Sequence, residues 1–212
     1  GTVNITANEK VVINDTGVKT KALSAYGDAN VTIDGGKQTI INGEITADGY
    51  GPVMQSDGNV EHQDNRIADD INVVIKGKDI VVDASLEAEE GVFARGDSTG
   101  IDNAVIIVGD ANTEKVTVRD VDTGLFAWNG GSKVEVNSDS LVISADGNFK
   151  DSGMGICAIN SSDANNKLAI VDVNAGKTEI TVKDGAFAYG IYANGKSNVD
   201  VTWYGGEPLI GK

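Results

Sequence analysis

Gly190-Ile191-Tyr192-Ala193-Asn194 is the clearest copy of a short motif that recurs along this chain. The motif is a small residue, an aliphatic residue, any residue and then alanine. Four further copies begin at Ala22, Gly91, Gly124 and Gly155. A degenerate copy is expected at Gly51-Pro52-Val53-Met54-Gln55. Recurrence of one motif at intervals of roughly 30 to 40 residues is typical of repeat proteins.

Short segments of alternating aliphatic residues follow most copies of the motif. One set contains Val31-Thr32-Ile33, Val105–Val108, Val134-Glu135-Val136 and Val199-Asp200-Val201. A second set contains Thr39-Ile40-Ile41, Ile80-Val81-Val82, Val116-Thr117-Val118, Leu141-Val142-Ile143 and Ile180-Thr181-Val182. Alternation with a period of two is typical of β-strands, and pairs such as Asp34-Gly35 are typical of turns. Each repeat is therefore expected to hold about three short strands.

The repeat distinguishes between two all-β architectures. Asx-Gly turns between apolar runs also fit antiparallel hairpins in a sandwich. A sandwich has no reason to return to one motif in every repeat, whereas a chain that winds round an axis places equivalent residues at equivalent corners. We therefore predict an all-β parallel β-helix, a solenoid of about six irregular three-strand coils. A single module would span residues 1–212, with a partial first coil in 1–20, repeated coils in 21–203 and an exit or truncated coil in 204–212.

Stacked coils predict columns of like residues inside the helix. One column would contain Leu23, Val92, Leu125, Ile156 and Ile191, and the next Ala25, Ala94, Ala127, Ala158 and Ala193. The alternate residues would then point outward: Phe93, Phe126, Cys157 and Tyr192, beside Tyr26, Arg95, Trp128, Ile159 and Asn194. Arg95 fixes this direction, because a buried unpaired guanidinium is very costly.

The outward aromatic residues are candidates for ligand binding, since exposed apolar patches and Tyr or Trp side chains often mark contact surfaces. The candidates are Tyr26, Phe93, Phe126, Trp128 and Tyr192. The structural alternative is that these side chains shield the strand stack, or that a loop or flanking element covers them.

Composition excludes several classes of partner. The chain has 32 acidic against 17 basic residues, a net charge of −15, which repels nucleic acid and anionic lipid surfaces. The single Cys157 cannot form an intramolecular disulfide, and the single His62 cannot supply a multi-histidine metal site. No metal or cofactor is predicted. No apolar run approaches the roughly 20 residues of a spanning helix, so no membrane insertion by this segment is expected. The chain begins Gly1-Thr2-Val3 without a signal region, and we expect a fragment of a larger surface protein.

A polysaccharide lyase or hydrolase is the main alternative function, and it would need clustered carboxylates. Candidate clusters are Asp69 and Asp70 near Arg66, Asp120 with Asp122, and Asp83 with Glu87, Glu89 and Glu90. Adjacent carboxylates on a strand point to opposite faces, and Cys157 has no histidine near it in sequence, so no catalytic residue is predicted. Calcium binding by Asp120 and Asp122 or by residues 160–166 stays open. A third class, ice binding, would rest on Thr32, Thr117 and Thr181 at comparable outward positions.

The segments Gly190–Val201 and Gly124–Val136 resemble the repeats of bacterial autotransporter passenger regions. This resemblance extends over about residues 20 to 203 at the level of the repeat. It implies a right-handed parallel β-helix that is exported through the outer membrane and displayed on the bacterial cell surface. It also implies a non-enzymatic, adhesin-type role. The implied partners are a host or neighbouring-cell surface protein or glycan, together with flanking coils of the same chain.

Overall fold

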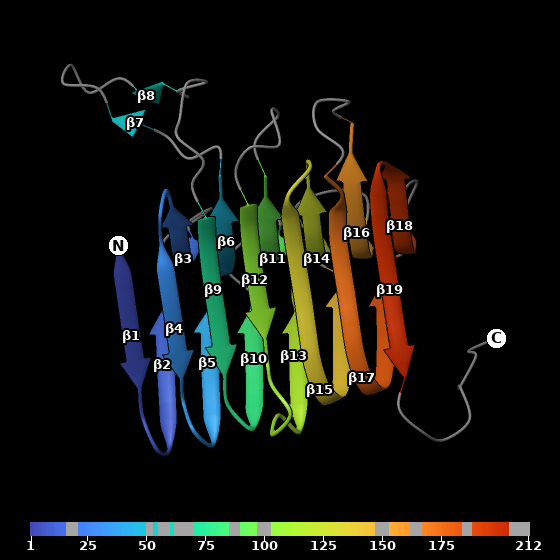
Figure 1. Cartoon of the computed structure of the whole chain (residues 1–212). Coiled ribbons are helices and arrows are strands. Elements are labelled where there is room, and N and C mark those ends of the chain that lie inside the picture. Colours follow the sequence, from blue (N-terminus) through green and yellow to red (C-terminus); the bar gives the residue numbers. More distant parts are fainter. Residues whose placement is uncertain are drawn as a thin grey trace.

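The computed structural model describes residues 1–15, 21–49, 53–54, 60–61, 70–84, 90–96, 103–146, 153–161, 167–183 and 188–203. These residues form β-strands and no helix. All but two of the strands lie in three rows along one axis, and neighbours within each row run parallel (Figure 1). The predicted all-β fold with parallel strands is confirmed.

The first and second rows belong to one eleven-stranded sheet, because two long strands, β15 (Ser132–Ala145) and β17 (Ala169–Val182), continue from one row into the other. The first row contains β1 (Thr2–Thr6), β4 (Asn30–Asp34), β9 (Asp70–Lys76), β12 (Asn103–Val108), the first halves of β15 (Ser132–Ala145) and β17 (Ala169–Val182), and β19 (Ser197–Trp203). The second row contains β2 (Lys10–Asn14), β5 (Gln38–Asn42), β10 (Asp79–Asp83), β13 (Lys115–Arg119) and the second halves of β15 and β17.

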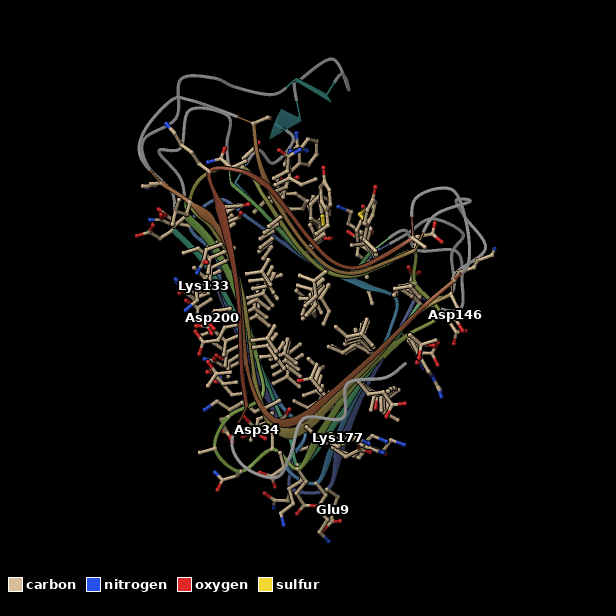
Figure 2. All side chains as sticks on the ribbon, turned by 90° about the vertical axis from the view of Figure 1, so that its right-hand side faces the viewer. Glu9, Asp34, Lys133, Asp146, Lys177 and Asp200 are labelled. Atoms are coloured by element: carbon tan, nitrogen blue, oxygen red, sulfur yellow. The ribbon has the colours of Figure 1, made fainter. Side chains whose placement is uncertain are left out.

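The third row is a separate six-stranded sheet that carries the recurring motif. It contains β3 (Lys21–Tyr26), β6 (Glu44–Asp48), β11 (Glu90–Arg95), β14 (Thr123–Trp128), β16 (Met154–Asn160) and β18 (Tyr189–Gly195). The chain passes from the first row to the second and then to the third before it starts the next coil. Seen along the axis, the rows form the sides of a triangle, and the third side bends inward (Figure 2).

Alternation along each strand separates the core from the surface. Val134 and Val136 of β15 are fully buried, whereas Lys133 and Glu135 between them face outward and form an ion pair of 2.5 Å. Figure 2 shows carbon side chains filling the triangle and the labelled Lys133 and Asp200 outside it. The period-two pattern in the sequence therefore reports a core that lies on one side of every strand.

The strand register places both predicted columns as expected. Leu125 pairs with Val92 on one side and Ile156 on the other, and Ile156 pairs with Ile191. The alanine column runs through Ala94, Ala127, Ala158 and Ala193 in the same registers. These ladders show that the chain returns to the same position in each turn round the axis.

The expected degenerate copy at Gly51–Gln55 is wrong. The second copy is β6, in which Ile45 pairs with Leu23 and Val92, and Ala47 extends the alanine column. Val53–Met54 instead forms β7, which pairs antiparallel with β8 (Val60–Glu61). The remaining residues of the proposed copy lie outside the described residues. Two first-row members, β9 and the first half of β17, were also absent from the expected strands.

Both ends of the stack expose residues that point toward the axis. Val3 and Ile5 continue the columns of Val31 and Ile33, yet they are 50% and 40% exposed. Ile191 at the other end is 51% exposed, although its column partner Ile156 is fully buried. The described part of the chain therefore ends in open coils on both sides.

Candidate functional site

Three of the five predicted ligand-binding residues form one aromatic cluster on the outer face of the third row. We use the name aromatic cluster for Phe93, Phe126 and Trp128. The Phe93 and Phe126 rings, on neighbouring strands, have centroids 5.1 Å apart. The Phe126 and Trp128 rings, on the same strand, lie 6.2 Å apart and almost parallel, at 9°. Such contacts add stability beyond the burial of area.

Arg95 completes the cluster by lying over the indole ring. Its guanidinium carbon is 4.8 Å from the Trp128 ring centroid, a cation–π distance. The same guanidinium is 3.7 Å from the Asp48 carboxylate on β6. Arg95 therefore lies on the outer face and is paired there, as predicted from the cost of burying an unpaired guanidinium.

The β6 segment adds charged residues to this face. Glu44, Thr46 and Asp48 alternate with the inward residues of β6, yet each is at least nine-tenths buried. Lys21 lies 3.4 Å from the Glu44 carboxylate, and the Thr46 hydroxyl donates to that carboxylate. The face thus has a charged part over β3 and β6, which reaches Arg95 on β11, and an aromatic and apolar part that begins at Phe93 on β11 and continues over β14, β16 and β18. Sequence reasoning missed these acids because it misplaced the second copy of the motif.

Tyr192 and Tyr26 lie apart from the aromatic cluster. Tyr192 is separated from Phe126 by Cys157 in the ladder of paired residues. Its ring contacts Tyr189 at 5.1 Å, and its hydroxyl oxygen accepts a hydrogen bond of 2.9 Å from Asn194. Tyr26 pairs with Asp48 at the other end of the row. The structure therefore brings together three of the five candidates.

Outward direction does not mean full exposure on this face. Phe93 is only 7% exposed and Cys157 is fully buried, whereas Tyr26 is 37% exposed. Phe126, Trp128 and Tyr192 are half-buried. The expected continuous exposed stripe is thus reduced to partly exposed rings over β14 and β18.

Burial makes the Cys157 thiol unreactive. Desolvation, with a smaller contribution from the Glu90 charge, raises the pKa of Cys157 to about 12. Since the thiolate is the reactive species, we expect iodoacetamide at pH 8 to leave the folded protein unmodified and to alkylate it after unfolding in urea. Alkylation of the native protein at the rate of a free thiol would contradict the burial.

The raised pKa also predicts a pH dependence of stability. The unfolded thiol ionises near its ordinary value of about 8.5, so unfolding releases a proton between that pH and the folded pKa of about 12. The free energy of unfolding should therefore fall as pH rises through this window, by about 1 kcal/mol per pH unit. Cys157→Ala, compared by urea unfolding at pH 8 and pH 10, should lack this component, and an identical slope in both proteins would contradict it.

The carboxylates considered for catalysis do not form one cluster with a common environment. Asp83 accepts a hydrogen bond of 2.8 Å from Arg119, and Arg119 also lies 3.8 Å from Asp120. Burial and the charges of Asp83 and Asp146 raise the pKa of Asp120. Asp120 is exposed, whereas Asp122 is buried, so the two carboxylates of this predicted pair have different surroundings.

The other members of the acidic clusters are placed as follows. Asp70 accepts a hydrogen bond of 2.6 Å from Asn103, and Glu90 opens β11 beside Thr123. His62, Arg66, Asp69, Glu87 and Glu89 lie outside the described residues. Within the described ranges, no three His, Cys, Asp or Glu side chains form a group that could hold a metal ion.

The threonines considered for ice binding do not share a ladder. Thr32 belongs to the first row, where Val74 and Asn4 are its partners. Thr117 pairs with Val142 in the second row. Thr181 also lies in the second row, but it pairs with Ser144, two residues further along the strand. The expectation of comparable positions is wrong. Thr32 lies in a different row from the other two, and within the second row Glu179, not Thr181, is the partner of Val142 in the ladder of Thr117.

Comparison of the chain with protein-family models, with curated proteins and with solved structures finds no match. The described part of the chain has no helix with the length and apolar character needed to cross a membrane.

Proposed function

We propose that this chain is a right-handed parallel β-helix segment of an autotransporter-like adhesin, displayed on a bacterial cell surface, and that its role is mechanical and adhesive. The observation that carries the proposal is the unbroken ladder of paired residues through all six third-row strands. Connections between parallel strands of one sheet are right-handed in nearly all proteins, which supports the proposed hand.

A stalk role is supported by the continuous core and the open ends. Each coil contacts its neighbours through both backbone hydrogen bonds and the aliphatic columns, so bending the stack would disturb every coil. The exposed axial residues Val3, Ile5 and Ile191 are suited to contact further coils of the same polypeptide. We infer that flanking coils cover both ends in the parent protein.

An adhesive role is assigned to the partly exposed aromatic side chains of the third row. Phe126, Trp128 and Tyr192 give this face, the side of the triangle that bends inward (Figure 2), partly exposed aromatic rings and one hydroxyl. Tyr and Trp are favoured in contacts with proteins and glycans because they give large contact areas at low entropic cost.

Substitution of Trp128 and Tyr192 by serine tests the adhesive role. The double variant should retain the strand content and cooperative unfolding of the parent, because both side chains lie outside the core. Attachment of the purified protein to epithelial cells or extracellular matrix should fall about tenfold or more if both rings are contact residues. Thr117→Ser with Val142→Ser, a matched pair on the second row, should retain attachment.

Unchanged attachment of the Trp128 and Tyr192 variant would contradict the assigned face. The enzyme alternative makes a different prediction, supported only by the raised pKa of Asp120 beside Asp83. It requires cleavage of polyuronates or other glycans that is lost in Asp69→Asn, Asp120→Asn or Asp122→Asn. Our proposal expects no such cleavage, and its detection would favour the enzyme.

A further inference from the structure

The connection between β12 and β13 is longer than its equivalents in the neighbouring coils. Residues 109–114 make this connection, whereas residues 35–37 and 77–78 join the corresponding strands of the two preceding coils. In the next two coils β15 and β17 pass the same corner as continuous strands. We call residues 109–114 the corner loop, and it lies at the corner of the triangle where Asp34 is labelled (Figure 2).

The corner loop is held in one conformation by hydrogen bonds to both neighbouring coils. The Thr113 hydroxyl donates to the Gly77 carbonyl at 2.9 Å and accepts from the Asp110 backbone at 3.0 Å. The Asp110 carboxylate accepts from the Asn112 backbone at 2.8 Å. The Asp139 backbone in turn donates to the Thr113 carbonyl at 2.9 Å. Because the corner loop is already ordered, a ligand that binds beside it would lose little affinity to the entropic cost of fixing the loop.

The loop borders a pocket of about 640 Å³ on the outer face of the first row. Val74 and Ile107 give this pocket two outward aliphatic side chains. Its polar lining comes from Lys76, Asp110, Asn137, Asp139 and Asn174. The volume lies within the usual range of small-molecule sites, and an apolar surface with a few convergent polar groups is their usual composition.

The polar groups of the pocket can both donate and accept hydrogen bonds. The Asn174 amide donates to Asn137 at 3.2 Å, and Asn137 donates to Glu135 at 2.9 Å, which fixes both amides. The Lys76 ammonium lies 3.9 Å from the Asp110 carboxylate at the pocket edge. Two carboxylates in the lining and a net charge of −15 disfavour an anionic ligand. An entirely apolar ligand would displace water from the remaining donor and acceptor sites of these groups without replacing its hydrogen bonds.

We propose that this pocket binds a short stretch of a neutral oligosaccharide. A pyranose ring has an apolar C–H face that fits against Val74 and Ile107, and its hydroxyls donate to Asp110 and Asp139 and accept from Lys76. The site lies on the first row, whereas the aromatic cluster lies on the third. It therefore stands or fails independently of the adhesive role proposed above.

Filling the pocket with a larger side chain tests the proposal. The probe is an equimolar mixture of mannotriose, cellotriose, maltotriose and tri-N-acetylchitotriose. Binding is detected by saturation-transfer NMR and then measured by titration of each trisaccharide that responds. The parent protein should bind at least one of them, and Ile107→Trp should weaken that binding at least tenfold. The control is Ile40→Trp, which adds the same ring at a half-buried outward position on the second row. It should bind like the parent.

A second variant and an acidic probe complete the experiment. Asp110→Asn keeps the acceptor for the Asn112 backbone but removes the charge, and it should weaken binding about tenfold, since hydrogen bonds to charged groups are the stronger ones. The melting temperatures of all variants should match that of the parent. The proposal is overturned if no neutral trisaccharide binds to the parent, if Ile107→Trp binds as well as Ile40→Trp, or if trigalacturonate binds more tightly than the neutral sugars.

Discussion

Replacement of Gly155 by alanine is expected to destabilise the protein by about 3 kcal/mol. A Cβ atom at this position would lie 2.2 Å from the Ile180 Cγ2 atom and 2.6 Å from the Gly190 carbonyl oxygen. The first contact belongs to a β17 side chain packed against the core and the second to the backbone of β18 in the next coil, so the added methyl group would require one of these strands to shift. Urea unfolding followed by circular dichroism measures the loss.

Gly190→Ala is the matched control for this substitution. Gly190 holds the same place in the motif, but β18 is the last described strand of the third row, and a Cβ there would meet no atom within 4 Å. We expect a change of less than about 0.5 kcal/mol. A loss at Gly190 equal to that at Gly155 would contradict our assignment of the cost at Gly155 to contact with the next coil.

Close backbone packing thus explains why the motif begins with a small residue, and the sequence alone did not reveal this reason. Gly91, Gly124 and Gly155 each lie against the backbone oxygen of the next glycine in the series, at 2.9, 2.6 and 2.6 Å from the Cβ position. Periodicity predicted that these positions are equivalent, because a solenoid repeats its environment in every coil. It could not predict that the backbones approach so closely there.

The inner columns were predictable for the same reason. Each aliphatic or alanine position meets mainly its own equivalents in the coils on either side, so the pattern in one copy repeats in the next. Leu125 and Ala127 are fully buried between partners of the same kind. Long-range contacts in such a fold become visible as a simple recurrence in the sequence.

The second coil escaped prediction because its motif lacks one residue. Lys21 pairs with Glu44 and Leu23 pairs with Ile45, which leaves Ala22 without a counterpart on β6. Without the small residue, Ile45-Thr46-Ala47 does not match the pattern. Gly51–Gln55 does contain a glycine, but its strand at Val53–Met54 pairs with β8 and not with the third row.

The sequence predicted the direction of side chains on the candidate site better than their exposure. Alternation fixes the face on which Phe93, Phe126 and Trp128 lie, but burial depends on neighbours in other strands. Phe93 is stacked against Phe126 and has Lys21 at 6.0 Å from its ring, a contact between strands far apart in sequence. The pocket beside the corner loop was missed too, although the extra residues between Val108 and Lys115 gave a signal in the length of that connection.

Truncation of Ile156 to alanine is expected to cost about 3 kcal/mol, whereas the same change at Ile191 should cost less than about 1 kcal/mol. The two residues are direct partners in one column, and both point toward the axis. Ile156 is fully buried between coils, so its removal leaves a cavity that the neighbouring strands cannot fill. Ile191 is 51% exposed because no described strand lies beyond β18.

The comparison measures how far each coil depends on its neighbours. Because residue type, strand position and direction are the same, the difference between the two losses reports the contribution of the outer coil alone. An equal loss of about 3 kcal/mol at both positions would show that Ile191 is buried in solution, which would contradict the open end. Joining a further coil after β18 should, by contrast, raise the cost at Ile191 toward that at Ile156, because burial of that side chain would then be complete.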